Sequence, residues 1–129
     1  MAINVLVTDD SGVMRSMIIK SMGMCGMKLG EVYQAANGQE GLAQLAGNWI
    51  DLVFVDINMP VMNGEEMIER MKAQDATADI PIIVISTEGS QTRIEALAQR
   101  GVKFIHKPFT PEKLRDIVAE TIGTGAFDG

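Results

Sequence analysis

Cysteine, long apolar stretches and clusters of basic residues are all scarce in this chain. The single cysteine, Cys25, cannot form an intramolecular disulfide, which fits a reducing compartment. No apolar run approaches the roughly 18 residues that a membrane-spanning helix needs, and the first residues lack the features of a signal peptide. The net charge is −6, whereas nucleic-acid binding needs a basic face. We therefore expect a cytoplasmic protein that neither spans a membrane nor binds nucleic acid directly.

The length of the chain limits its organisation. Its 129 residues suffice for one domain and are too few for two ordinary ones. We expect one domain over residues 1–122. Residues 123–129 contain three glycines and are predicted to form a flexible C-terminal tail, either a natural end or the start of a linker to a further domain.

Short apolar runs alternate with apolar residues at helical spacing along the whole chain. The runs predicted to be strands are residues 3–7, 31–36, 52–55, 82–85 and 102–105. Five helices are expected between and after them, the third beginning at the capping residue Asn63. Runs that are apolar on both faces are typical of a parallel sheet covered on both sides. The pattern thus predicts an α/β fold, a doubly wound five-stranded parallel sheet with five helices.

Polar side chains follow four of the predicted strands at the point where each strand ends. In a doubly wound sheet the carboxyl ends of the strands lie at one edge, and ligands bind there. We therefore expect one site at this edge. Its candidate residues are Asp9, Asp10, Asp56, Ser86, Thr87 and Lys107.

The chemistry of these side chains suggests a metal ion and a phosphoryl group. Carboxylates that converge on one point repel one another unless a cation joins them. Oxygen ligands suit Mg²⁺, and the presence of only one histidine and one cysteine argues against a zinc site. A carboxylate beside Mg²⁺ can also act as a nucleophile toward phosphorus, with an ammonium group and a hydroxyl binding the phosphoryl oxygens. These residues alone leave open whether Asp56 is a nucleophile or only a ligand.

Four segments carry a more specific pattern, residues 7–10, 55–64, 85–88 and 107–110. In this order and spacing they resemble the receiver domain of two-component response regulators, most closely its single-domain chemotaxis (CheY-like) type. The resemblance extends from residue 3 to about residue 122. It implies a flavodoxin-like sheet with the strand order 2-1-3-4-5.

The resemblance also implies a role for each acidic residue of the site. Asp56 is implied as the phosphoacceptor. Asp9, Asp10, Asp56 and the backbone carbonyl of Asn58 are implied as ligands of Mg²⁺ or Mn²⁺, with Asp10 the more direct ligand of the acid pair. The residues implied to tune the lifetime of the aspartyl phosphate are Asn58, Thr87 and Glu88.

The remaining implied roles concern binding of the phosphoryl group and the response to it. Lys107 and Thr87 would lie at the phosphoryl group, and the bond from Lys107 to Pro108 is expected to be cis. Ser86 is the implied switch hydroxyl. Phe104 is the implied aromatic switch, and it stands where the motor-binding type usually has tyrosine.

The resemblance implies that the protein is a signalling switch and that it is not an enzyme acting on an external substrate. A histidine kinase or phosphotransfer domain would donate the phosphoryl group. A downstream protein would bind the face of the fourth helix, fifth strand and fifth helix, in chemotaxis. The alternatives are a phosphorelay intermediate or the receiver part of a larger regulator. Either a monomer or a phosphorylation-dependent dimer is expected.

Two functions of other classes compete with the switch. A phosphatase of the haloacid-dehalogenase kind needs a general acid two residues after its nucleophile. Asn58 stands there after Asp56, and Ser11 stands there after Asp9, so both positions lack the acid. A receiver-like module that is never phosphorylated is the other rival. The complete set of acids together with Lys107 argues against it.

Overall fold

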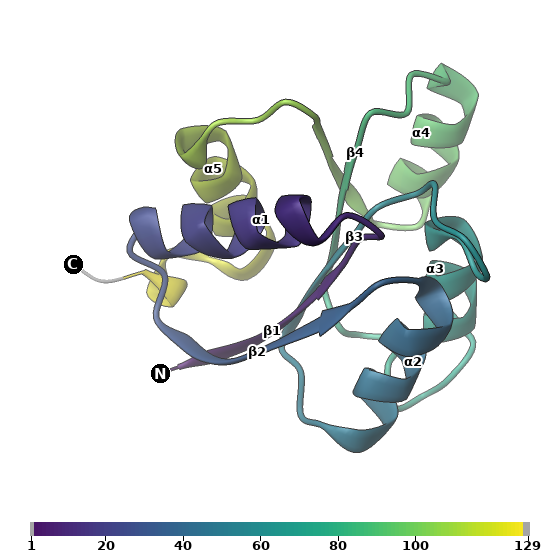
Figure 1. The fold of residues 1–129 in the computed structure, drawn as a ribbon, viewed down its shortest axis with the longest axis horizontal. Helices are drawn as coiled ribbons and strands as arrows, with labels where there is room; N and C mark the ends of the chain where they lie inside the picture. The colour runs from purple at the N-terminus through teal and green to yellow at the C-terminus, as the bar shows by residue number, and fades with distance from the viewer. Residues whose placement is uncertain (1, 128–129) are drawn as a thin grey trace.

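The computed structural model describes residues 2–127. Five parallel strands in this part of the chain form one sheet in the order β2-β1-β3-β4-β5 (Figure 1). The strands are β1 (Ile3–Thr8), β2 (Leu29–Ala35), β3 (Leu52–Val55), β4 (Ile82–Ser86) and β5 (Lys103–His106). The helices are α1 (Gly12–Met24), α2 (Gly38–Gly47), α3 (Gly64–Lys72), α4 (Gln91–Gln99) and α5 (Pro111–Ile122). The predicted fold class and the implied strand order are both confirmed.

The sheet separates the apolar core into two clusters. Helices α1 and α5 cover one face, and helices α2, α3 and α4 lie on the other (Figure 1). Successive residues of β1 alternate between them, because Val5 and Val7 join the α1/α5 cluster whereas Leu6 joins the other. All residues of β3 and β4 are buried, and each large apolar side chain contributes about 1.5–3 kcal/mol on burial. The two central strands are therefore held firmly at the positions from which Asp56 and Ser86 project.

Side-chain caps begin each of the five helices and so set the loops at the carboxyl edge of the sheet. The capping residues are Ser11, Asn37, Asn63, Ser90 and Thr110. Asn63 accepts a hydrogen bond from the backbone N–H of Glu66 at 2.9 Å, as its spacing predicts. The next residue must be glycine, because a Cβ atom on Gly64 would lie 2.1 Å from the carbonyl oxygen of Asp56. The loop after Asp56 thus returns tightly to the end of its own strand.

The C-terminal segment differs from the expectation of a flexible tail over residues 123–129. Thr124–Ala126 form a short 3₁₀ helix, and Phe127 is 6% exposed in the α1/α5 cluster. Lys28 donates its backbone N–H to the carbonyl oxygen of Ala126 at 2.8 Å. The reason is the apolar side chain of Phe127, which fills the core face despite its glycine-containing surroundings. Residues 128 and 129 lie outside the described part of the chain.

The amino edge of the sheet carries an exposed tryptophan held by polar contacts. Trp49 is 79% exposed, and its indole N–H donates to Oδ1 of Asp51 at 3.0 Å. Asn4 donates its backbone N–H to the other oxygen of Asp51 at 2.9 Å and its side-chain amide to the carbonyl of Trp49 at 3.0 Å. This edge lies at the opposite end of β3 from Asp56. Among residues 2–127, no helix has the length and apolar character to cross a membrane.

Candidate functional site

Three acidic side chains meet at the carboxyl ends of the neighbouring strands β1 and β3. Asp9 and Asp10 follow β1, and Asp56 follows β3, which pairs with β1 along Val5 to Thr8. One carboxylate oxygen from each of the three lies within 4.8 Å of the others. Asp9 is 1% exposed and Asp56 is 8% exposed, whereas Asp10 faces solvent. The predicted acidic cluster is therefore present, with one edge open to solvent.

Lys107 reaches this cluster from the end of β5. Its ammonium group donates to Oδ2 of Asp9 at 2.9 Å and to Oδ2 of Asp56 at 3.1 Å. The backbone N–H of Lys107 donates to the carbonyl oxygen of Ser86 at 2.9 Å, which joins the ends of β4 and β5. The bond from Lys107 to Pro108 is cis, as the resemblance implies. Lys107 thus bridges two of the three carboxylates, although it lies 98 positions from Asp9 and 51 positions from Asp56 along the chain.

Burial and charge act in opposite directions on these groups. Burial raises the pKa of Asp9 above its ordinary value, and the hydrogen bonds from Lys107 and the Ser11 N–H lower it less than burial raises it. For Lys107, burial alone would lower the pKa, but hydrogen bonds to Asp9 and Asp56 raise it above its ordinary value. Lys107 therefore stays protonated at neutral pH, and its ammonium group lies between the carboxylates of Asp9 and Asp56.

The donor set fits a hard divalent cation. Three carboxylates beside one ammonium group leave excess negative charge, and a cation would relieve the repulsion between them. All the converging side-chain donors are oxygens, the atoms that Mg²⁺ and Mn²⁺ prefer. Asp10 and the exposed edge of the cluster leave room for the water molecules that Mg²⁺ usually retains. Asp9, Asp10 and Asp56 are thus suited to hold such an ion.

The switch residues implied by the sequence lie near this edge but are not all directed at Asp56. The Ser86 side chain is fully buried, and its hydroxyl accepts a hydrogen bond from the backbone N–H of Glu88 at 3.2 Å. Thr87 is exposed. Phe104 is half-buried on β5, and its ring meets that of His106 edge to face, with centroids 4.6 Å apart. Ser86 and Phe104 are therefore engaged with their own loop and strand.

Asn58 and Glu88 face one another from the loops after β3 and β4. The side-chain amide of Asn58 donates to Oε1 of Glu88 at 3.4 Å. The Ser90 N–H is the main cause that lowers the pKa of Glu88, so this carboxylate is ionised at neutral pH. Arg93 binds the same oxygen of Glu88 at 2.5 Å and also forms an ion pair with Glu65 of α3.

Sequence reasoning missed Arg93 and Glu65. Neither residue belongs to a motif, and they lie 28 positions apart on different helices. An exposed helical charge is most often only solvated. Their contact depends on how α3 and α4 lie side by side, so the sequence held no signal from which it could have been found.

Comparisons with known proteins show the family to which this chain belongs. The family model for the response regulator receiver domain matches residues 5–119. The chain belongs to the response regulator receiver domain family. Receiver domains are signalling switches, and the acidic cluster and Lys107 described above lie in such a domain.

Individual relatives match the receiver over nearly its whole length. A chemotaxis protein CheY homolog from Campylobacter jejuni is 35% identical over 96% of this chain and 95% of its own. The structure of CheY4 from Vibrio cholerae is 31% identical, with a TM-score of 0.82, over 95% of this chain and 100% of that one. The CheX-CheY-BeF3-Mg²⁺ complex from Borrelia burgdorferi contains a chain that is 26% identical, with a TM-score of 0.83, over 92% of this chain and 87% of that one.

Proposed function

We propose that the receiver accepts a phosphoryl group on Asp56 from the phosphohistidine of a histidine kinase or phosphotransfer domain. The observation that carries the proposal is the pair of hydrogen bonds from Lys107 to Asp9 and Asp56 within a cluster of three carboxylates. A buried aspartate beside an ammonium group is suited to act as a nucleophile toward phosphorus. Asp10 alone of the three acids faces solvent, which suits it to bind a hydrated cation.

In the proposed step, the phosphoryl group moves from an imidazole nitrogen of the donor to Asp56. A carboxylate oxygen of Asp56 forms a bond to phosphorus while the phosphorus–nitrogen bond to the donor imidazole breaks, and the imidazole keeps the electron pair. Lys107 places its positive charge at the carboxylate that receives the phosphoryl group, where it offsets the added negative charge. When bound by Asp9, Asp10, Asp56 and the backbone carbonyl of Asn58, Mg²⁺ or Mn²⁺ supplies further positive charge to the phosphoryl oxygens.

Ser86 and Phe104 form the element that responds. The Ser86 hydroxyl would exchange the N–H of Glu88 for a phosphoryl oxygen, and Phe104 would turn from its half-buried position further into the core. A shift of population from 1:99 to 99:1 needs about 5.5 kcal/mol. Hydrogen bonds to a charged group contribute about 1.5–3 kcal/mol each. Bonds from Ser86 and Lys107 to the phosphoryl group would therefore contribute about 3–6 kcal/mol, half or more of this free energy.

The surface next to Phe104 is suited to bind the downstream protein. A hollow of about 380 Å³ lies there. Its lining residues are Phe104, His106, Pro108, Phe109, Thr110 and Lys113. It joins β5 to the start of α5, so reorientation of Phe104 would change its shape. We propose the face formed by α4, β5 and α5 as the surface that a partner reads.

Chemotaxis is the process we propose for this switch. Its support is the set of chemotaxis relatives that match the receiver along nearly their whole length. The Borrelia burgdorferi complex contains CheX and Mg²⁺ together with CheY, which further supports a protein partner and this metal ion. A phosphorelay step, or a place in a larger regulator, would use the same site. A cytoplasmic location follows from the proposed kinase donor.

Acetyl phosphate with Mg²⁺ provides the direct test, read by intact mass. We expect an adduct of about 80 Da, the mass of a phosphoryl group, which Asp56→Asn abolishes and chelation of the metal suppresses. Asp10→Asn should require a higher Mg²⁺ concentration for the same yield, because it removes the most exposed ligand. Asp75→Asn, at an exposed position away from the site, should behave like the wild type.

Other outcomes of this assay would favour the rival functions. Continuous phosphate release from many phosphate esters would indicate a phosphatase of the haloacid-dehalogenase kind. No adduct with acetyl phosphate, or with a phosphorylated histidine domain, would contradict the switch. Binding to such a domain regardless of Mg²⁺ and phosphodonor would indicate a passive module.

A further inference from the structure

Arg93, in the first turn of α4, contacts acidic side chains from two other elements. Its Nε lies 3.2 Å from each carboxylate oxygen of Glu65 in α3, and its Nη2 also binds Glu65. Its Nη1 donates to Oε1 of Glu88 at 2.5 Å. The Glu88 side chain is 13% exposed, and those of Arg93 and Glu65 are 34% exposed. These side chains are less exposed than those of the Arg70–Glu66 and Arg100–Glu69 pairs.

The same carboxylate of Glu88 connects Arg93 to the mouth of the phosphoacceptor site. Asn58, two residues after Asp56, donates to the oxygen of Glu88 that Arg93 also binds. The backbone N–H of Glu88 donates to the hydroxyl of Ser86. A continuous set of polar contacts therefore runs from α3 through Arg93 to both loops beside Asp56.

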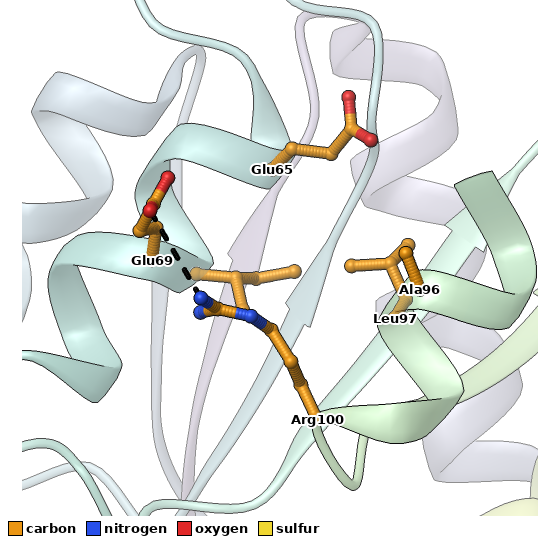
Figure 2. A pocket seen from close by; sticks show the side chains of 6 residues that line it. Glu65, Glu69, Ala96, Leu97 and Arg100 are labelled. Atoms are coloured by element: carbon orange, nitrogen blue, oxygen red, sulfur yellow. Dashed lines mark ion pairs between the residues drawn. The ribbon is translucent and has the colours of Figure 1, made fainter.

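The rest of the boundary between α3 and α4 is loosely filled. A cavity of about 130 Å³ lies between these helices (Figure 2). Its lining residues are Glu65, Ile68, Glu69, Ala96, Leu97 and Arg100. Figure 2 shows Glu65 toward one end of the cavity and the ion pair between Glu69 and Arg100 toward the other. That second pair spans 3.9 Å between more exposed side chains, so Arg93 makes the tighter connection.

The chemistry of arginine explains why this residue holds the loop. Its planar guanidinium group can bind one carboxylate through two N–H groups and present a third N–H to another acid. Glu65 fixes the guanidinium, and the guanidinium then fixes Glu88. Movement of the Ser86 hydroxyl toward a phosphoryl group requires the loop to release the bond from Glu88. The contacts of Arg93 oppose that release.

We propose that Arg93 is a positioning residue that sets the speed of the phosphoryl cycle. Through Glu65 and Glu88 it holds Asn58 and the loop after β4 across the mouth of the site, where they slow both the transfer of a phosphoryl group to Asp56 and its hydrolysis. This inference rests on the proposed function of Asp56 and adds a control that acts from α4 and α3.

The test compares Arg93→Ala with Arg100→Ala. We expect Arg93→Ala to accelerate both phosphorylation by acetyl phosphate and loss of the adduct by about three- to tenfold, the size typical of residues that modulate coupling. Arg100→Ala removes an arginine from the same boundary without touching Glu88, so its rates should match those of the wild type. Unchanged or slower rates in Arg93→Ala, or an equal acceleration in Arg100→Ala, would overturn the proposal.

A double-mutant cycle tests whether Arg93 acts through Glu65. Glu65→Gln should accelerate both rates in the same direction, and the double variant should add little to Arg93→Ala. Fully additive effects would contradict the route through Glu65. Urea unfolding supplies the structural control, because lower stability with unchanged rates would give Arg93 a purely structural role. Absence of any adduct on the wild-type protein would overturn the proposed function itself, and this inference with it.

Discussion

Asp9 is a buried carboxylate that its surroundings neutralise only in part. It shares the ammonium group of Lys107 with Asp56, and burial raises its pKa. A raised carboxyl pKa means that the folded protein binds this proton more readily than the unfolded chain does. The ionised form of Asp9 therefore costs folding free energy at neutral pH, and proteins accept such a cost where the charge has a function.

Asp9→Asn should stabilise the metal-free protein at neutral pH by about 1 kcal/mol, a typical size for a single-residue effect. The penalty is complete above the raised pKa of the folded state and disappears below the ordinary aspartate pKa of about 3.9. Urea unfolding should therefore show a gain at neutral pH that shrinks as the pH falls through this window. Asp75→Asn provides the matched control, and a destabilised Asp9→Asn at neutral pH would contradict the prediction.

At the scale of single elements, the strands and the helix starts could be predicted because their causes are local. β3 was predicted at residues 52–55 and lies there, since a run buried on both faces needs no partner to be recognised. The edge strand β2 was predicted at residues 31–36 and begins two residues earlier, at Leu29. Its residues are only partly buried, so its start is set by pairing with β1, which no local pattern encodes.

In the candidate site, too, some residues could be predicted from local sequence and others could not. Asp9, Asp56 and Lys107 each follow a strand within a short motif, so the order of the sheet brings them together and the sequence could predict them. The contact between Arg93 and Glu65 arises from the approach of two exposed helix faces. Such contacts depend on side-chain reach across a boundary, which spacing along the chain does not determine.

The loop between β3 and α3 contains a strained residue. Val61 has φ of 67° and is 76% exposed, although β-branched residues are disfavoured in the left-handed region. Val61→Gly should therefore raise the free energy of unfolding by about 1 kcal/mol, the lower end of the cost of such strain. Val13→Gly is the matched control, because Val13 is equally exposed but helical, and it should lower stability. A loss in both variants would show that the strain is negligible.

At the scale of the whole molecule, the sheet keeps two packing regions apart. The Ser86 loop and Arg93 belong to the side of α3 and α4, whereas Phe127 completes the cluster beneath α1 and α5. The composition of residues 123–129 indicated a flexible tail. The burial of Phe127 depends on the segment after α1, where Met27 forms a bridge with it, and that neighbour is about a hundred residues away in the sequence.

Phe127→Ala should lower the free energy of unfolding by about 3 kcal/mol, the usual cost of truncating a buried phenylalanine. The side chain is 6% exposed and lies under the guanidinium of Arg115, 5.2 Å from the ring centre. Urea unfolding followed by circular dichroism measures the change. Trp49→Phe, at an exposed aromatic residue, should change stability little. A loss below about 0.5 kcal/mol in Phe127→Ala, the range of ordinary surface substitutions, would mean that the segment contributes nothing to folding.

The position of Trp49 has a practical consequence for optical experiments. This residue is the chain's single tryptophan, and it sits in solvent at the end of β3 remote from Asp56. Its fluorescence emission should hardly respond to phosphorylation. The wild-type protein should therefore give no tryptophan signal for the reaction at Asp56. Rapid-mixing measurements of the cycle will need an indole introduced beside the acidic cluster. In such a variant, Trp49→Phe would remove the background signal.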